Sequence, residues 1–306
     1  DRLGKNAYGS TRRGIAPAYG DRTVKKAIQI GELLYPERLR ARLEALLEWK
    51  LARAEKFYGV KDAFTFEQML EWTETNGAKL RPLIADTSAT LEAGAKAGKK
   101  ILFEAQLGTL RDLNFGIYPF TTSSCALAAY APIGGGLFGY PIDRVVAVVK
   151  AFSTCVGEGP FVSLMEKELA DPLRESAKEY GAATGRPRTI GHFDALATRY
   201  GAWGQGATDI ALTKLDSLSG MKRLKICVDY EYRGQRVGRF PLNAVLDEAT
   251  PVYEEMPGWD EDITGVREFA ALPKTAQDYV VRIEQLIERP ITYISVGPER
   301  EALILR

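Results

Sequence analysis

The chain has 306 residues, of which 45% are hydrophobic and 26% are charged, and its formal net charge is +1. These values are typical of a folded protein with a large core. The near-neutral charge predicts no binding of nucleic acid or of an anionic membrane surface, and no apolar run reaches the length of a membrane-spanning helix. We therefore expect one large domain over residues 1–306.

Cysteine and histidine are scarce. The three cysteines, Cys125, Cys155 and Cys227, are odd in number and lie far apart, without the spacing of a metal site. They predict reduced thiols and a cytoplasmic location. A single histidine, His192, argues against a conventional zinc site or a catalytic triad, and such a residue is more often packed in the structure than used to carry a proton.

The first third of the chain predicts helices. Leu3–Tyr19, rich in glycine and arginine, is expected to be a loop, and Lys25–Leu34 a short helix or strand. Pro36 is suited to the first turn of a helix, and leucines at helical spacing follow it as far as Gly59, a typical helix end.

A second helix begins at Thr65, which forms a capping box with Gln68. Gly77 and Pro82 predict a bend or break before Gly98.

The rest of the chain alternates strands and helices. Leu224–Tyr230 is expected to turn back at Gly234 as a hairpin, and Pro273–Glu288 has one apolar helical face. The other predicted strands are Lys99–Glu104, Val145–Val149, Asp209–Thr213, Ile291–Val296 and Ala302–Leu305. This alternation predicts an α/β fold with a central, mostly parallel sheet flanked by helices and a β-hairpin region.

The loop Tyr180–Arg188 has the composition of an anion site. Its glycines free the backbone, and Arg186 and Arg188, separated by Pro187, present guanidinium groups suited to bidentate contact with carboxylate or phosphate. A surface turn with solvated arginines is the alternative.

Two further motifs follow predicted strands. In Lys214-Leu215-Asp216, the carboxylate suits two hydrogen bonds from the N1 and exocyclic amine of guanine, although this short pattern is common by chance. Ser295-Val296-Gly297 suits the edge of a base, or is a simple turn. The hydroxyl run Thr121–Ser124 suits phosphate or a helix cap equally.

Taken in order, these segments resemble the adenylosuccinate synthetase family. Thr11–Tyr19 resembles the family's Thr-Gly-Arg-Gly-Ile-Gly-Pro-x-Tyr signature, and Tyr180–Arg188 resembles its Gly-Ala-Thr-Thr-Gly-Arg-Arg-Arg loop. The other segments that resemble family blocks in the same order are Phe103–Thr109, Tyr118–Ser124, Phe152–Phe161, Thr213–Asp216, Tyr253–Trp259 and Ser295–Pro298.

The resemblance implies a fold similar to P-loop NTPases and a homodimeric ligase. Such an enzyme uses Mg²⁺ and GTP to phosphorylate O6 of IMP, and L-aspartate then displaces the phosphate to give adenylosuccinate. The residues it implies for IMP are Ser10, Thr11, Lys25, Gln106, Thr122, Val156 and Arg186. For aspartate they are Ala182, Ala183, Thr184, Gly185, Arg186, Pro187 and Arg188. For GTP they are Arg188, Lys214, Leu215, Asp216, Ser295, Val296 and Gly297.

Several positions depart from the family pattern. Lys25 replaces an arginine that crosses to the partner's IMP, which keeps the charge but loses the planar fork. Leu107 replaces a glutamine that contacts the purine. Gln106 lies one residue earlier and can make that contact instead only if the backbone shifts. Ala183 replaces a threonine, and His192 a tryptophan.

The family's phosphate loop, Gly-Asp-Glu-Gly-Lys-Gly-Lys, does not occur in the sequence. Because the chain starts at Asp1, we expect the sequence to be a truncated protein that lacks its N-terminal part. The catalytic base and acid and the Mg²⁺ ligands are then expected in that part, none of them in this chain, which should have little activity alone. The alternatives are a paralogue that acts on another purine nucleotide or amine donor, and a non-catalytic nucleotide-binding remnant.

Overall fold

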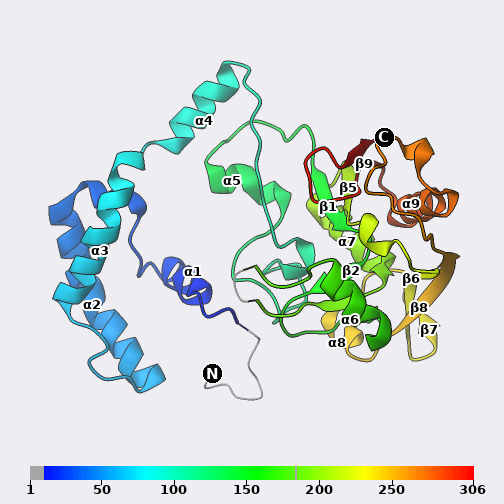
Figure 1. Ribbon diagram of the computed structural model, residues 1–306. Helices are drawn as coiled ribbons and strands as arrows, with labels where there is room; N and C mark the ends of the chain where they lie inside the picture. Colours follow the sequence, from blue (N-terminus) through cyan, green and yellow to red (C-terminus); the bar gives the residue numbers. More distant parts are fainter. Residues whose placement is uncertain (1–9, 183–184) are drawn as a thin grey trace. The chain divides into compact units, whose positions relative to one another are not determined.

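The computed structural model describes residues 10–182 and 185–306, and their contacts divide the chain into two compact units. The helical unit comprises residues 12–102 (Figure 1, blue to cyan) together with residues 135–138. The sheet unit comprises Ser10 and Thr11 with residues 103–134 and 139–306. Within the described part of the chain, every helix is too short or too polar to span a bilayer.

The helical unit is built around a small leucine-rich core. Leu33, Leu39 and Leu43 are buried in it, and Arg81 donates from Nε to the carbonyl of Leu33 at 2.8 Å. Its helices are α1 (Ile15–Thr23), α2 (Pro36–Tyr58), α3 (Phe66–Leu80) and α4 (Thr87–Lys96), with 3₁₀ turns η2 (Ile30–Leu34) and η3 (Arg81–Leu83).

The predicted helix signals in this unit are largely confirmed. Pro36 occupies the first turn of α2, and Gly59 ends the helix in the left-handed conformation at φ 64°. Thr65 and Gln68 form the capping box of α3. Gly77 does not interrupt α3, because the absence of a side chain lets Leu33 approach closely, and the break comes at η3, which contains Pro82.

Two predictions were wrong. The supposed loop Leu3–Tyr19 contains the start of α1, whose Pro17 lies within the first turn, where no intrahelical amide bond is lost. Lys99–Glu104 is not a strand: no strand among residues 10–182 and 185–306 pairs with it, and Leu102 is 91% exposed. A short apolar run without a pairing partner gains neither ladder hydrogen bonds nor burial.

The main sheet of the sheet unit has the order β1-β5-β9-β10. Strands β1, β5 and β9 are parallel, and β10 pairs with β9 in the antiparallel sense, so the predicted mostly parallel sheet is confirmed. The strands are β1 (Val146–Lys150), β5 (Asp209–Thr213), β9 (Ile291–Ser295) and β10 (Leu303–Leu305).

Helices bury this sheet. Ile210 and Leu212 of β5 and Ile294 of β9 are fully buried in the same cluster as Ile283 of the C-terminal helix. The helices outside the helical unit's core are α5 (Ala131–Gly135), α6 (Lys167–Ser176), α7 (Ala195–Gln205), α8 (Asn243–Leu246) and α9 (Lys274–Ile287). The 3₁₀ turns are η4 (Thr109–Arg111), η5 (Ala128–Tyr130), η6 (Asp216–Leu218) and η7 (Phe269–Ala271).

Further strands form two smaller sheets. The predicted hairpin is confirmed as β6 and β7, joined at Gly234, and β6 also pairs with β8 and with β4. The remaining strands are β2 (Ser153–Cys155), β3 (Thr189–Gly191), β4 (Phe193–Asp194), β6 (Arg223–Tyr232), β7 (Gln235–Arg236) and β8 (Thr250–Pro257). The pairing of β2 with β3 matters for the site, because β3 directly follows Arg188.

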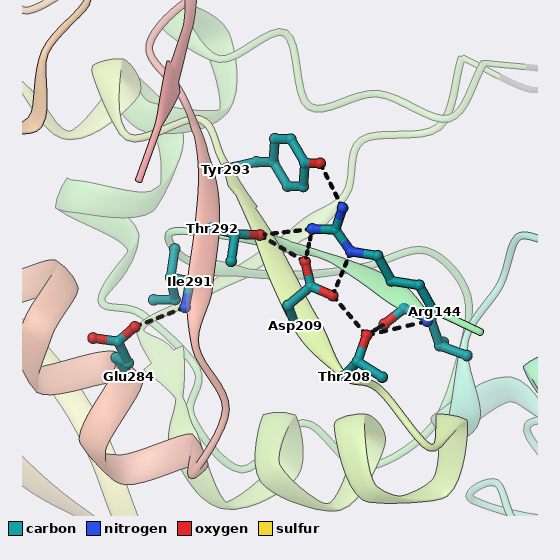
Figure 2. A network of polar contacts seen from close by, with 8 residues as sticks. Arg144, Thr208, Asp209, Glu284, Ile291, Thr292 and Tyr293 are labelled. Atoms are coloured by element: carbon teal, nitrogen blue, oxygen red, sulfur yellow. Dashed lines mark hydrogen bonds and ion pairs between the residues drawn. The ribbon is translucent and has the colours of Figure 1, made fainter.

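A polar network fastens the amino ends of the parallel strands (Figure 2). Asp209, the first residue of β5, binds the guanidinium of Arg144 through both oxygens and accepts from the hydroxyls of Thr208 and Thr292 at 2.6 Å. Arg144 also donates to the hydroxyl of Tyr293 at 2.9 Å. The network satisfies a nearly buried carboxylate and leaves the carboxyl ends of the strands as the other edge of the sheet.

Candidate functional site

The carboxyl ends of the parallel strands carry the candidate nucleotide residues. β1 ends at Lys150, β5 ends at Thr213 immediately before Lys214, and β9 ends at Ser295. In α/β sheets this edge is where ligands bind, because the loops that follow the strands converge there. The two predicted motifs and Lys150 therefore come to one edge of one sheet.

The two segments predicted for guanine lie side by side. The amide of Leu215 donates to the carbonyl of Ser295 at 3.3 Å, and the hydroxyl of Ser295 donates to the carbonyl of Gly297 at 2.8 Å. Leu215 and Val296 are fully buried in the main core, and the amide of Val296 is bonded to Ala302. These two residues hold the segments together, so that Lys214 and Asp216 flank Leu215 on one segment while Ser295 and Gly297 flank Val296 on the other.

Asp216 is a half-buried carboxyl at the start of η6. Burial raises its pKa, an effect that the charge of Asp262 reinforces and that its backbone amide and Lys214 oppose. A carboxylate in such surroundings gains from two N–H donors, because hydrogen bonds to the charged form offset the loss of water.

The arginine loop is a closed turn. Tyr180 and Pro187 form an isolated antiparallel bridge, and the amide of Gly181 donates to the carbonyl of Arg186 at 2.8 Å. Gly185 has φ 63°, a left-handed conformation that favours glycine. The predicted Ala183 and Thr184 lie outside the described residues, while Ala182, Gly185 and Pro187 are exposed.

The two arginines of the loop face different neighbours. Arg186 donates from Nη2 to the carbonyl of Ser10 at 3.1 Å, so two residues predicted for IMP lie together. Arg188 donates from Nη1 to Glu179 at 3.0 Å, and its Nε is buried without a hydrogen-bond partner in the described structure.

Glu179 forms ion pairs with three basic residues at this edge of the sheet. Its side chain is 2% exposed, and it binds Lys150 at 2.7 Å as well as Arg188, with Lys214 Nζ 3.2 Å from its second oxygen. Burial by itself would raise the pKa of Glu179, but the hydrogen bond and charge of Lys150, together with Lys214, hold it below its ordinary value.

Two more of the residues predicted for IMP, Thr122 and Val156, are joined by Arg111. Its carbonyl accepts from the amide of Thr122 at 2.8 Å, and its Nη2 donates to the carbonyl of Val156 at 3.3 Å. Arg111 also binds the carbonyl of Phe120 and the sulfur of Cys155. One guanidinium thus links the hydroxyl-rich segment to the segment after β2.

Three predicted positions are not brought into these clusters by any described contact. Thr11 and Gln106 are exposed in the sheet unit. Lys25 belongs to the helical unit, where it has φ 61° and its carbonyl accepts from Arg42 at 3.2 Å.

His192 is a packed residue, as its sequence context predicts. It is 4% exposed, binds Glu166 through Nε2 at 2.9 Å and meets the ring of Tyr253 edge-on at 5.1 Å. Burial lowers its pKa despite the nearby Glu166.

Sequence reasoning missed Lys150, Glu179 and Arg111. Lys150 had one usable signal, its position immediately after the predicted strand Val145–Val149. Glu179 and Arg111 are single charged residues among many, and only the folded chain shows that each has several partners.

Comparison with known proteins identifies the family. The adenylosuccinate synthetase family pattern matches residues 1–304. The chain is 52% identical over 306 residues to adenylosuccinate synthetase 2 of Pseudoalteromonas translucida, covering all of this chain and 72% of that one. The chain belongs to the adenylosuccinate synthetase family. It is thus a member of a family of ligases.

Other adenylosuccinate synthetases agree. The chain is 45% identical over 303 residues to that of Caldanaerobacter subterraneus, covering 99% of this chain and 71% of the other. Its fold matches the fully ligated adenylosuccinate synthetase of Plasmodium falciparum with a TM-score of 0.92 at 32% identity, covering 100% of this chain and 72% of that chain. The α/β fold class predicted from the sequence is confirmed.

Proposed function

We propose that this chain carries the guanine, IMP and aspartate subsites of a GTP-dependent ligase that joins IMP to L-aspartate. In this reaction O6 of IMP takes the γ-phosphoryl group of GTP, releasing GDP. The amine of aspartate then attacks C6 and expels phosphate, forming adenylosuccinate. The observation that supports the proposal most directly is the meeting of Lys214–Asp216 with Ser295–Gly297 at the carboxyl edge of the sheet.

Asp216 selects guanine in this proposal. Its carboxylate accepts hydrogen bonds from N1 and the exocyclic amine, a donor pair that adenine lacks. The aliphatic stem of Lys214 lies along the face of the base. Selectivity comes from the cost of leaving a half-buried carboxylate without donors when adenine occupies the site.

The arginine loop holds the acidic substrates. Arg188 faces the aspartate carboxylates and GTP, and Arg186 faces IMP beside Ser10. Thr122 and Val156, fixed by Arg111, complete the IMP subsite. Guanidinium groups suit this task because they bind two oxygens at once and stay charged. The roles of the other predicted residues of the loop, Ala182 to Pro187, belong to the same proposal.

The family resemblance also implies Mg²⁺. Among the residues described, no group of three or more His, Cys, Asp or Glu side chains is placed to hold a metal ion. The proposal therefore assigns the ion no ligand and no step in this chain. The proposal also includes a homodimer in which Lys25 reaches the partner's IMP. It further includes a cytoplasmic location.

The test measures binding and product formation separately. Displacement of a fluorescent GTP analogue from the chain should require far less GTP than ATP. Adenylosuccinate formation from IMP, GTP and aspartate is assayed with the chain alone and with the chain joined to the part of the Pseudoalteromonas relative outside the matched region. Equal displacement by GTP and ATP, together with no product from the fusion, would overturn the proposal.

The alternative substrates are tested in the same assay. The fusion is offered other purine nucleotides and other amines in place of IMP and aspartate. A clear preference for IMP with aspartate removes the paralogue, and product formation removes the non-catalytic remnant. The identities of 52% over 306 residues and 42% over 301 residues to two adenylosuccinate synthetases favour neither alternative.

A further inference from the structure

Glu179 is a buried acidic residue that no predicted subsite includes, yet it binds residues from two of them. Arg188 belongs to the candidate aspartate loop, and Lys214 belongs to the candidate guanine site. Glu179 lies between these residues, three positions beyond the end of α6 and just before the loop. Its backbone is fixed as well, because its carbonyl accepts from the amide of Arg188 at 3.0 Å.

We propose that Glu179 is a positioning residue shared by the aspartate and guanine subsites, setting Arg188 and Lys214 at a fixed separation. The inference rests on the proposed function for the identity of the two ligands. The three basic partners come from three different segments: the end of β1, the end of the loop and the residue after β5. A single carboxylate therefore restrains three basic side chains that come from three segments.

The charge balance of the cluster favours an anionic ligand. Lys150, Arg188 and Lys214 place three positive charges around the single negative charge of Glu179. The surplus is held in a partly buried place, where charges interact more strongly than in water. Because Arg188 Nε has no hydrogen-bond partner in the described structure, the guanidinium retains a donor for a carboxylate or phosphate.

The conformation of Lys214 shows how tightly the position is held. Lys214 has φ 61°, a left-handed conformation that is uncommon for a residue with a side chain. Its Nζ donates to the carbonyl of Ala177, just past the end of α6, at 2.5 Å while facing Glu179. This pair of contacts directs the side chain towards the loop and gives the strained backbone a compensating interaction.

A ligand-independent measurement tests the positioning role. In the Glu179→Gln variant the side-chain shape is kept and the charge is lost. We expect modification of Arg188 by a dicarbonyl reagent and of Lys214 by an acylating reagent, each followed by mass spectrometry of the peptides, to become about tenfold faster, as for a loss of about 1.4 kcal/mol of protection. Unchanged rates at both residues, or a change at one only, would overturn the proposal.

Asp209→Asn is the matched control. Asp209 is also a nearly buried carboxylate bound to an arginine on the same sheet, but it lies at the amino ends of the strands. This variant should lose stability and leave both modification rates unchanged. If Asp209→Asn raises the two rates as much as Glu179→Gln, general loosening is the cause and the positioning role is refuted.

A second variant covers the case in which Glu179→Gln does not fold. Glu179→Asp keeps the charge but shortens the side chain by one methylene, so it cannot reach all three basic partners. It should raise at least the Lys214 rate, and equality with the parent chain at both residues counts against the proposal.

The ligand arm separates this proposal from the proposed function. With Glu179→Gln, the affinities for the GTP analogue and for aspartate should fall together by about tenfold, while Asp209→Asn retains both. If the parent chain binds neither ligand, the proposed function fails, and the modification rates still decide whether Glu179 positions Arg188 and Lys214. Loss of affinity for one ligand alone would contradict a shared role.

Discussion

At the residue scale, the chemistry of the site depends on a few charged side chains in partly buried places. Asp216 is half-buried and its pKa is raised chiefly by that burial, whereas Glu179 is almost fully buried and its pKa is lowered by its basic partners. The difference in environment fits the proposed tasks, in which Asp216 accepts hydrogen bonds from guanine and Glu179 positions the basic residues with which it pairs.

We expect Asp216→Asn to change base selectivity. The amide donates a hydrogen bond to the 2-oxo group of xanthine but meets the exocyclic amine of guanine with its own N–H. The variant should weaken GTP relative to xanthosine triphosphate by roughly tenfold or more, consistent with one mismatched hydrogen bond to a partly buried group. Competition of the two nucleotides against a fluorescent GTP analogue measures this ratio, and an unchanged ratio would exclude Asp216 from the guanine site.

At the element scale, close backbone packing joins β8 to the turn that follows Asp216. The amide of Gly258, directly after β8, donates to the carbonyl of Lys222 at 2.9 Å. The indole of the neighbouring Trp259, which is 3% exposed, donates to the hydroxyl of Ser219 at 3.0 Å. A β-carbon on Gly258 would lie 1.7 Å from the carbonyl oxygen of Met221. The chain after β8 can therefore pack this closely against Met221 only with glycine at position 258.

Gly258→Ala should be strongly destabilising. The added methyl meets backbone atoms, which cannot rotate away, so β8 and the Met221 segment must separate. We expect a loss of about 2 kcal/mol or more in the free energy of unfolding, as for overpacking elsewhere. Denaturant unfolding followed by circular dichroism measures it.

Gly265→Ala provides the control for this prediction. A β-carbon there meets nothing within 4 Å, and Gly265 is not at positive φ. Its free energy of unfolding should stay within about 0.5 kcal/mol of the parent value. Equal losses in the two variants would show that the contact with Met221 is not the cause.

At the scale of the whole molecule, buried carboxylates link stability to pH. Asp112, Glu179 and Asp209 all have lowered pKa values in the sheet unit. For Asp209 the main cause is the hydrogen bond from Arg144, which outweighs the opposing effect of burial. A folded pKa below the unfolded value of about 3.9 means that the stabilisation is complete above that pH and declines as the pH falls further.

Asp209→Asn should lower the free energy of unfolding at neutral pH. It should also make that free energy fall less steeply as the pH drops. We expect this variant to lose about 2 kcal/mol in the free energy of unfolding at pH 7. The loss is smaller than for breaking a fully buried pair, because Arg144 is half exposed. Below pH ~4 the difference from the parent chain should shrink, since the parent also loses this charge. Urea unfolding across this pH range measures both effects.

The exposed Asp260 offers a control for the pH prediction. Asp260→Asn should reproduce the parent curve at each pH. If Asp209→Asn and the parent chain differ by the same amount at pH 7 and below pH ~4, the linkage to Asp209 is wrong.

Local signals in the sequence determined the elements that need only local chemistry. Pro36 and Gly59 delimited α2, the Thr65–Gln68 capping box began α3, and Asp209–Thr213 was placed as a strand to the residue. Caps, turns and apolar periodicity act between residues close in the chain, so they can be read without the fold. The ordered motifs also determined the family.

Tertiary structure decided what depends on distant partners. Lys99–Glu104 resembled a strand but pairs with no strand in the described part of the chain, and Gly77 did not break its helix because Leu33 packs against it. Glu179 had no local signal, and its importance arises because Lys150, Arg188 and Lys214 converge on it from separate segments. The sequence by itself indicated the motif and loop residues of the candidate site. The fold decided which of them touch and added Lys150, Glu179 and Arg111, because burial and electrostatic pairing are set by distance in space rather than along the chain.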